Sequence, residues 1–485
     1  MKNQVHLITY VDRIAPKGLQ GLQKLLMGKL KDVFGGVHLL PFFFPIDGAD
    51  AGFDPIDHTE VDSRLGVWDD IKELSQTTDI MADVIVNHIS AKSPQFLDYL
   101  NRGEESENAN LFLMESSIFP EGITKEELQK IYRPRQGKPF TVISLKNGVE
   151  KTFWTTFTSN QIDIDVKSEA GIAYLESILK RFYESGIKMI RLDAAGYAIK
   201  KAGTSCFMIP ETFEFINWFR NSAKTMGIEV LVEIHSYYKK QIEIAKQVDW
   251  VYDFALPPLI LHAIFNKTSA YLKKWLEISP RNAITVLDTH DGIGVIDIGG
   301  YLGEKGLIPD EDIDRLVEQI HKNSRGESKQ ATGAAASNLD LYQVNCTYFD
   351  ALGCNENKYL LARAIQFFSP GVPQVYYVGL LGEKNDMELL HKTQVGRDIN
   401  RHYFIGNELD NALDRPIVKR LINLVKFRNS YAAFNGNFSI ITSNSEKLIL
   451  VWDKGIDKAT LTIDFSKLDF IISYTENGFE KILVI

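Results

Sequence analysis

The chain has 485 residues, of which 45% are hydrophobic and 24% are charged, and its net charge at pH 7 is -9. This hydrophobic content supports a large buried core, and the length predicts one large domain with smaller ones attached. The acidic balance disfavours nucleic acid and anionic membranes as partners, and three cysteines are too few for a disulfide scaffold.

The amino-terminal residues MKNQVHLITYVDR do not match a secretory signal. Their apolar stretch is short, contains His6 and leads into Asp12 and Arg13, whereas a signal needs a longer apolar run and a cleavage site. No later segment approaches about 20 continuous apolar residues, the length of a membrane span. We therefore expect a cytoplasmic protein without a membrane partner.

Eight short apolar runs are typical of strands that are buried on both faces. They occupy residues 5–11, 37–43, 80–86, 187–192, 229–234, 250–256, 283–287 and 373–378. Helical patterns lie between many of them, as at 168–184, where Ser168 can cap the start and Gly186 lies just past the end. This alternation predicts a parallel α/β fold, and eight strands over roughly 380 residues fit a (β/α)8, or TIM, barrel.

Two intervals interrupt the alternation, and the last part of the chain changes character. The second interval contains a helical pattern that opens at Pro309–Asp310, followed by a stretch at 323–338 rich in Ser, Gly, Ala and Thr that predicts a mobile loop. Runs at 447–452 and 460–465 predict a small all-β domain at the end. The expected organisation is barrel at 1–86, first insertion at 87–167, barrel at 168–291, second insertion at 292–353, barrel at 354–433 and β domain at 434–485.

Ionisable side chains follow several predicted strands at their carboxyl ends. They are His88, Arg191, Asp193, Glu233, His290 and Asp291. The active site of such a barrel forms at this edge, so the three carboxylates would converge on one pocket. Glycoside chemistry uses such a set: one carboxylate attacks the anomeric carbon, and a second, kept protonated, donates to the leaving oxygen. In the retaining form the pair lies about 5–5.5 Å apart, and such close like charges raise the pKa of one of them.

Four motifs at these strand ends resemble, in order, those of the α-amylase superfamily, glycoside hydrolase family 13. They are DVIVNH at 83–88, IRLDAAGY at 190–197, EIH at 233–235 and THD at 289–291. Residues 35–66, NLDLYQVN at 338–345 and GRDINRHY at 396–403 resemble the members of this family that cleave sucrose with phosphate. Many members carry Asn where this chain has Thr289, but the sucrose-cleaving members share the Thr.

The resemblance implies a double displacement on three carboxylates. Asp193 would be the nucleophile, Glu233 the general acid/base and Asp291 the stabiliser of the transition state. Arg191 would help keep Asp193 ionised. The substrate-binding residues that it implies are Asp50, Phe53, His88, Phe157, Gln161, Arg191, Tyr197, His290, Asp340, Gln343 and Arg397. On the phosphate or acceptor side it implies Tyr132, Arg135, Leu341 and Tyr342.

The expected reaction is the reversible phosphorolysis of sucrose to α-D-glucose 1-phosphate and D-fructose. Because the protein is acidic, phosphate must be held by placed arginines, and Arg133, Arg135 and Arg397 are the candidates. This chemistry requires no metal and no cofactor, although some amylases hold calcium near the residue that corresponds to Asn87. The partners would be small molecules, sucrose and inorganic phosphate, and the resemblance leaves a homodimer open.

Three alternatives stay open on the sequence. A phosphorylase of the same kind could act on sucrose 6′-phosphate or glucosylglycerate, although Leu341, Tyr342 and Gln343 favour unphosphorylated sucrose. A sucrose hydrolase or transglucosylase would use the same carboxylates. A non-catalytic amylase-like module is disfavoured, because such proteins typically lose part of the acidic triad, and all three acids are present here.

Overall fold

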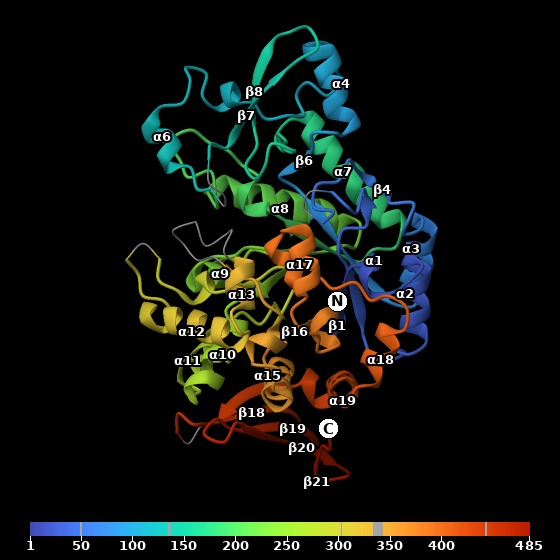
Figure 1. Cartoon of the computed structure of the whole chain (residues 1–485), viewed down its shortest axis with the longest axis vertical. Helices are drawn as coiled ribbons and strands as arrows, with labels where there is room; N and C mark the ends of the chain where they lie inside the picture. Colours follow the sequence, from blue (N-terminus) through green and yellow to red (C-terminus); the bar gives the residue numbers. More distant parts are fainter. Residues whose placement is uncertain (49–50, 134–136, 302, 333–342, 442–443) are drawn as a thin grey trace.

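The computed structural model describes the chain from Met1 to Ile485 except for residues 49–50, 134–136, 302, 333–342 and 442–443. Figure 1 shows a barrel in the middle, a lobe above it and an antiparallel sheet below it. Among the described helices, none has both the length and the apolar character needed to cross a membrane.

A closed barrel of eight parallel strands forms the centre of the molecule (Figure 1). Its strands are β1 His6–Thr9, β2 Gly36–Leu39, β5 Asp79–Ile85, β10 Met189–Asp193, β11 Glu229–Val232, β12 Trp250–Asp253, β13 Ala283–Thr285 and β16 Val372–Tyr376. They close in the order β1-β16-β13-β12-β11-β10-β5-β2. All eight predicted strand positions are confirmed, and with them the (β/α)8 class.

Seven of the eight strands end earlier than the sequence predicts, and two of them end where a helix begins. The run at 250–256 stops at Asp253, whose carboxylate accepts a hydrogen bond from Leu256 N at 3.0 Å, and helix α10 (Leu256–Asn266) begins there. The run at 373–378 stops at Tyr376, where the short helix α16 (Tyr377–Leu380) begins. The first turn of each helix is also buried, so hydrophobicity continues past the strand end and does not mark it.

Helices surround the barrel. The longer ones are α2 Gly18–Met27, α3 Trp68–Ser75, α7 Glu169–Glu184, α8 Pro210–Thr225, α9 Tyr238–Ala245, α10, α11 Ala270–Ile278, α15 Glu356–Phe368 and α19 Pro416–Ser430. The shorter ones are α1 Val11–Ile14, α14 Tyr348–Ala351, α16, α17 Met387–Thr393 and α18 Glu408–Asp414. As predicted, Ser168 caps α7: its Oγ accepts a hydrogen bond from Gly171 N at 3.0 Å, and Leu175, Leu179 and Phe182 are buried.

The segment between β5 and α7 forms the lobe above the barrel in Figure 1. It contains β6 His88–Ser90, α4 Pro94–Arg102, α5 Glu115–Ile118, α6 Lys125–Lys130, β7 Phe140–Ser144, β8 Glu150–Trp154 and β9 Gln161–Asp163. Strands β6 and β9 are antiparallel, with His88 opposite Asp163 and Ser90 opposite Gln161. This pairing returns the end of the segment to the barrel edge where it started.

The segment after β13 carries β14 Ile293–Gly294, the 3-10 helix η3 Ile296–Ile298, α12 Asp310–Asn323, α13 Glu327–Thr332 and β15 Gln343–Val344. Helix α12 begins where Pro309–Asp310 predicts it. The mobile loop predicted at 323–338 is wrong for its first half, because residues 327–332 form α13; residues 333–338 lie outside the described part. In α13 the side chains of Ser328 and Thr332 are buried. Ser328 Oγ lies 2.7 Å from both His321 Nδ1 and Ser324 Oγ. Tertiary packing therefore stabilises a helix of weak intrinsic propensity.

The last strands form one antiparallel sheet, which confirms the predicted all-β domain. They are β17 Asn437–Ile441, β18 Lys447–Lys454, β19 Asp457–Asp464, β20 Asp469–Glu476 and β21 Phe479–Ile482. Trp452 fixes this sheet to α15 by donating Nε1–H to the Phe368 carbonyl at 2.8 Å. The sheet lies at the opposite end of the barrel from the lobe in Figure 1. The six domain boundaries given above remain a proposal.

Candidate active site

Arg191 connects three carboxylates at the carboxyl end of the barrel. It lies on β10 between β5 and β11, in register with Asp83 of β5. Its Nη1 is 2.6 Å from Asp83 Oδ1 and 3.0 Å from Asp193 Oδ1, and its Nη2 is 2.9 Å from Glu233 Oε1. The guanidinium is buried, so these ion pairs are little screened by solvent. One cation therefore holds the two predicted catalytic carboxylates side by side.

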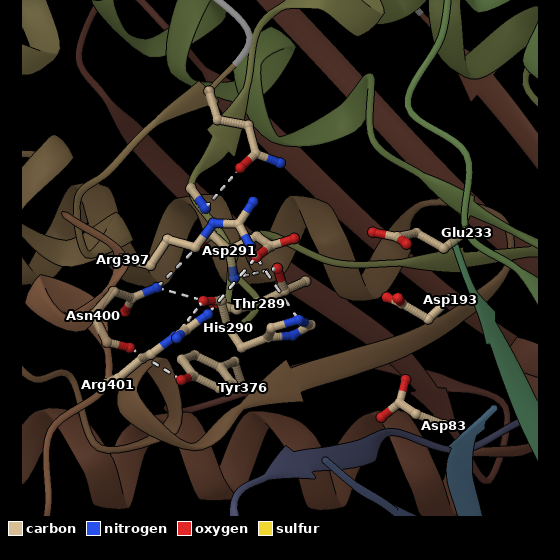
Figure 2. Close-up of polar contacts among 12 residues, drawn as sticks. Asp83, Asp193, Glu233, Thr289, His290, Asp291, Tyr376, Arg397, Asn400 and Arg401 are labelled. Atoms are coloured by element: carbon tan, nitrogen blue, oxygen red, sulfur yellow. Dashed lines mark hydrogen bonds and ion pairs between the residues drawn. The ribbon is translucent and has the colours of Figure 1, made fainter. Parts of the chain in front are cut away.

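Asp193 and Glu233 point toward Asp291, which approaches from the loop after β13 (Figure 2). The side chains of Asp193, Glu233 and Asp291 are 16%, 14% and 11% exposed, so each is largely buried but still reachable. Burial raises the pKa of Asp193 well above its usual value; Arg191 opposes this, and Glu233 adds to it. The three predicted catalytic residues therefore share one electrostatic environment at one edge of the barrel.

Two arginines and the His290 ring surround the Asp291 carboxylate. Its Oδ1 lies 2.8 Å from Arg397 Nη1, 3.9 Å from Arg401 Nη2 and 3.7 Å from His290 Nε2. Burial alone would raise the pKa of Asp291, but Arg397, His290 and Arg401 outweigh it and hold the pKa well below its usual value. Asp291 is therefore a carboxylate that stays charged next to Asp193.

The 3-10 helix η4 (Gly396–Asn400) and the residue after it hold the loop that carries Asp291 (Figure 2). Asn400 donates from Nδ2 to the Thr289 carbonyl at 2.9 Å, and Arg401 donates from Nε to the His290 carbonyl at 2.9 Å. Tyr376 at the end of β16 donates its hydroxyl to the Asn400 carbonyl at 3.0 Å. The GRDINRHY motif thus supplies positioning residues as well as Arg397.

Phe53, His88, Phe157, Gln161 and His290 form a second group at this edge. Phe53 stacks on His290 with ring centroids 4.8 Å apart, and its carbonyl oxygen is 3.0 Å from His88 Nε2. His88 also lies 3.1 Å from Gln161 Nε2, and its ring contacts that of Phe157 edge-on at 5.3 Å. The structure therefore brings these five predicted substrate-binding residues together.

Tyr132 and Tyr197 lie on an aromatic wall that continues from Phe157. Tyr197 packs edge-on against Phe157 at 5.1 Å, and Phe207 lies 4.6 Å from Tyr197 and 4.4 Å from Tyr132. Phe207 was not expected in this site. Gly196 permits the packing, since a Cβ at that position would lie 2.7 Å from Phe207 Cε2.

Gln343 reaches the site from β15 in the second insertion. It accepts a hydrogen bond from Gly292 N through Oε1 at 3.3 Å, and its Nε2 lies 3.3 Å from His235 Nε2. His235 in turn contacts Asp297 of η3, whose Oδ2 lies 2.9 Å from Nδ1. The sequence predicts Gln343 but misses His235 and Asp297.

Comparison with known proteins identifies the family. Residues 20–291 match the family model "Alpha amylase, catalytic domain". The chain is 60% identical to the sucrose phosphorylase of Agrobacterium vitis, over 96% of each chain. It is 56% identical to that of Bifidobacterium adolescentis, over 96% of this chain and 92% of the other. The chain belongs to the α-amylase family, in the group of the sucrose phosphorylases.

A crystal structure in the same family has the same fold over the whole chain. This structure, of sucrose 6F-phosphate phosphorylase from Thermoanaerobacter thermosaccharolyticum, aligns with a TM-score of 0.93 at 38% identity. The alignment covers 100% of this chain and 98% of the other. The barrel, both insertions and the final sheet are therefore shared, and the family resemblance predicted from the motifs is confirmed.

Some members of the α-amylase family hold calcium near the residue that corresponds to Asn87. In this chain Asn87 contacts the amino group of Lys200. Lys200 Nζ lies 2.8 Å from Asn87 Oδ1, 2.7 Å from Asp163 Oδ2 and 2.5 Å from the Tyr197 carbonyl. Asp163 also accepts hydrogen bonds from Thr156, through its N at 3.0 Å and its Oγ1 at 2.5 Å. Lys200 therefore supplies the positive charge at this position and joins the first insertion to the barrel.

Five predicted site residues lie outside the described residues: Asp50, Arg135, Asp340, Leu341 and Tyr342. Among the described ones, the sequence alone did not assign a role to Asp83, although it begins the DVIVNH motif. Asp83 is buried, lies 3.0 Å from His38 Nε2 and pairs with Arg191. A charged residue inside an apolar strand requires a buried partner, and this rule could have indicated from the sequence that Asp83 pairs with a cation.

Proposed function

We propose that this protein catalyses the reversible phosphorolysis of sucrose with retention of configuration. The observation that carries the proposal is the ion-pair bridge from Arg191 to both Asp193 and Glu233, with Asp291 facing them. Retaining glycoside chemistry requires a nucleophile and an acid/base, and a third carboxylate at the same barrel edge can stabilise the transition state. The two sucrose phosphorylases at 60% and 56% identity support sucrose and phosphate as the substrates.

In the first step Asp193 attacks the anomeric carbon of the glucosyl group while Glu233 gives its proton to the departing fructose oxygen. The bond from carbon to fructose breaks, and a β-glucosyl ester forms on Asp193. Arg191 stabilises the attacking carboxylate against the burial that raises its pKa. Asp291 stabilises the positive charge that develops on the sugar ring, because its own pKa is held low.

In the second step a phosphate oxygen attacks the same carbon, and the bond to Asp193 breaks. The electron pair returns to the Asp193 carboxylate, and any proton on the attacking oxygen passes to Glu233. The product is α-D-glucose 1-phosphate. Arg135 is the arginine that we propose for phosphate, together with Tyr132, Leu341 and Tyr342 on the acceptor side.

The glucosyl group would occupy the space bordered by Phe53, His88, Phe157 and His290, with Asp50 and Arg397 on its hydroxyls. Gln161, Tyr197, Asp340 and Gln343 would face the fructosyl unit. An apolar wall with a few convergent polar groups is the usual form of a small-ligand site. We also propose a cytoplasmic location for the protein, and a homodimer as its assembly.

The test is to incubate the purified protein with sucrose, with and without inorganic phosphate, and to identify the sugars by NMR. We expect phosphate-dependent release of fructose with α-glucose 1-phosphate as the co-product. A β-configured phosphate ester, or fructose release that ignores phosphate, contradicts the proposal. Sucrose 6′-phosphate and glucosylglycerate offered in parallel identify the donor, and sucrose should be the preferred one.

A further inference from the structure

His235 lies beside Glu233 but has no part in the scheme above. It follows β11, and its ring stacks on Phe254 with centroids 3.8 Å apart and planes 11° apart. One oxygen or nitrogen atom from each of Glu233, His235 and Asp291 lies within 4.8 Å of the other two. A ring fixed this close to two carboxylates affects any ligand that enters between them.

Asp297 fixes the orientation of that ring. The Asp297 carboxylate is fully buried and accepts three hydrogen bonds: from His235 Nδ1 at 2.9 Å, from Ser236 N at 3.1 Å and from Gln241 Nε2 at 2.7 Å. Two of these donors are independent of the histidine, so the carboxylate keeps its place whether or not the ring is there. Rotation of His235 would break a buried, charge-assisted hydrogen bond.

The orientation directs the second ring nitrogen toward the acceptor side. In the neutral ring Nε2 accepts a hydrogen bond from Gln343 Nε2 at 3.3 Å, and in the protonated ring Nε2–H faces Glu233 Oε1 at 4.0 Å. The charged groups that face His235 include Asp297 from the second insertion, Glu233 after β11 and Asp291 after β13. Burial disfavours the protonated ring, but Asp297, Glu233 and Asp291 outweigh it and hold the pKa of His235 above its usual value.

A further cation beside Glu233 favours the second step of the reaction. Glu233 has by then given its proton to fructose, so an incoming phosphate anion meets the carboxylates of Glu233 and Asp291. Negative charges that lie close together in a buried site repel strongly unless a cation lies between them. Water, the competing acceptor, is neutral and gains little from the same cation.

We propose that Asp297 is a positioning residue that holds His235 as the cation facing the acceptor position, so that the glucosyl intermediate reacts with phosphate in preference to water. The proton on His235 is neither gained nor lost in the step: the ring donates a hydrogen bond to a phosphate oxygen and keeps its charge. This inference rests on the proposed function and extends it to acceptor choice.

The test compares two acceptors on the same intermediate. In the Asp297→Asn variant, we expect kcat/KM for phosphate to fall about tenfold or more, as for loss of a charge-assisted contact. The rate of sucrose hydrolysis without phosphate and kcat/KM for sucrose should change by less than about threefold, since neither involves an incoming anion. Glu304→Gln is the matched control, because Glu304 lies in the same insertion but pairs with Lys239 at the surface.

The pH profile separates this role from a purely structural one. His235 is positive below its pKa, so its charge is lost as the pH rises through that value. Replacement of Asp297 by Asn removes a negative neighbour and lowers the pKa of His235, so the loss of phosphate reactivity should move to lower pH. At each pH, kcat/KM for phosphate of the variant is divided by that of the wild type, and this ratio removes the effect of the ionisation of phosphate itself.

His235→Gln provides a second variant in case Asp297→Asn does not fold, because it leaves Asp297 with Ser236 and Gln241. Its kcat/KM for phosphate should fall by a larger factor than its rate of hydrolysis. An equal fall in hydrolysis and phosphorolysis, or an unchanged kcat/KM for phosphate in a folded variant, overturns the inference. If the wild type itself shows no phosphate dependence, the proposed function fails instead.

Discussion

Arg363 on α15 contacts both oxygens of Asp288, each 2.8 Å from its Nη2. Both side chains are buried, and Asp288 lies three residues before Asp291 in the same loop. Gly379 packs directly over the pair, since a Cβ there would lie 1.9 Å from Asp288 Oδ2. The base of the loop that carries Asp291 is therefore fixed by an ion pair that no ligand reaches.

Replacement of Arg363 by Met should destabilise the fold by about 3–5 kcal/mol, because it leaves the charge of Asp288 buried without its partner. The free energy of unfolding from urea titration measures this loss. The double variant Arg363→Met with Asp288→Asn should recover part of it. Lys358→Met, on the same helix but partly exposed, is the control and should change stability little.

Replacement of Lys200 by Met should also destabilise the fold, by about 3–5 kcal/mol, because it leaves the buried Asp163 carboxylate without its cation and with the hydrogen bonds from Thr156. The neighbouring exposed Lys201, which pairs with Glu211 at the surface, provides the matched control as Lys201→Met. Thermal unfolding of the two variants should differ clearly. Equal melting temperatures would show that Lys200 does not stabilise the junction of barrel and insertion.

Replacement of Asp193 by Asn should remove nearly all turnover of sucrose, by about four orders of magnitude or more, because an amide cannot form the glucosyl ester. Mass spectrometry of the protein after mixing with sucrose should detect no covalent glucosyl adduct in the variant. Its unfolding temperature should stay near that of the wild type. A variant that still accumulates the adduct would show that another residue is the nucleophile.

Replacement of Glu233 by Gln should lower kcat/KM for sucrose by about 10²–10⁴, the usual contribution of a general acid. The loss should be much smaller with a glucosyl donor whose leaving group needs no proton, such as glucosyl fluoride. Steady-state rates with both donors give the comparison. If the variant lost activity equally on both, Glu233 would act in some way other than protonation.

Replacement of Arg401 by Gln should change the pH dependence of catalysis. Arg401 is one of the groups that hold the pKa of Asp291 well below its usual value, so its removal raises that pKa. Asp291 acts as a carboxylate, so activity is lost as the pH falls through its pKa, and the acid limb of kcat/KM for sucrose should move to higher pH. The exposed Arg315 provides the control as Arg315→Gln, and an unmoved acid limb in Arg401→Gln would contradict the assignment.

Much of the barrel could be read from local patterns. All eight strands lie where short apolar runs predict them, because a strand covered on both faces must be apolar along its length. Helix α7 begins after Ser168 because its cap is a local hydrogen bond between residues three apart. Most strand ends were predicted too late in the chain. At Asp253 and Tyr376 the reason is that burial continues into the next helix.

The sequence by itself determined which carboxylates meet, since parallel strands end at one edge and Asp193, Glu233 and Asp291 follow such strands. Only the tertiary structure decided what surrounds them. Arg401 approaches Asp291 from a different segment, and Asp297 reaches His235 across 62 positions of chain. The physical reason is that a strand end is indicated by the pattern of its neighbouring residues in the sequence. An ion pair between distant segments produces no such local pattern and forms only when the barrel closes.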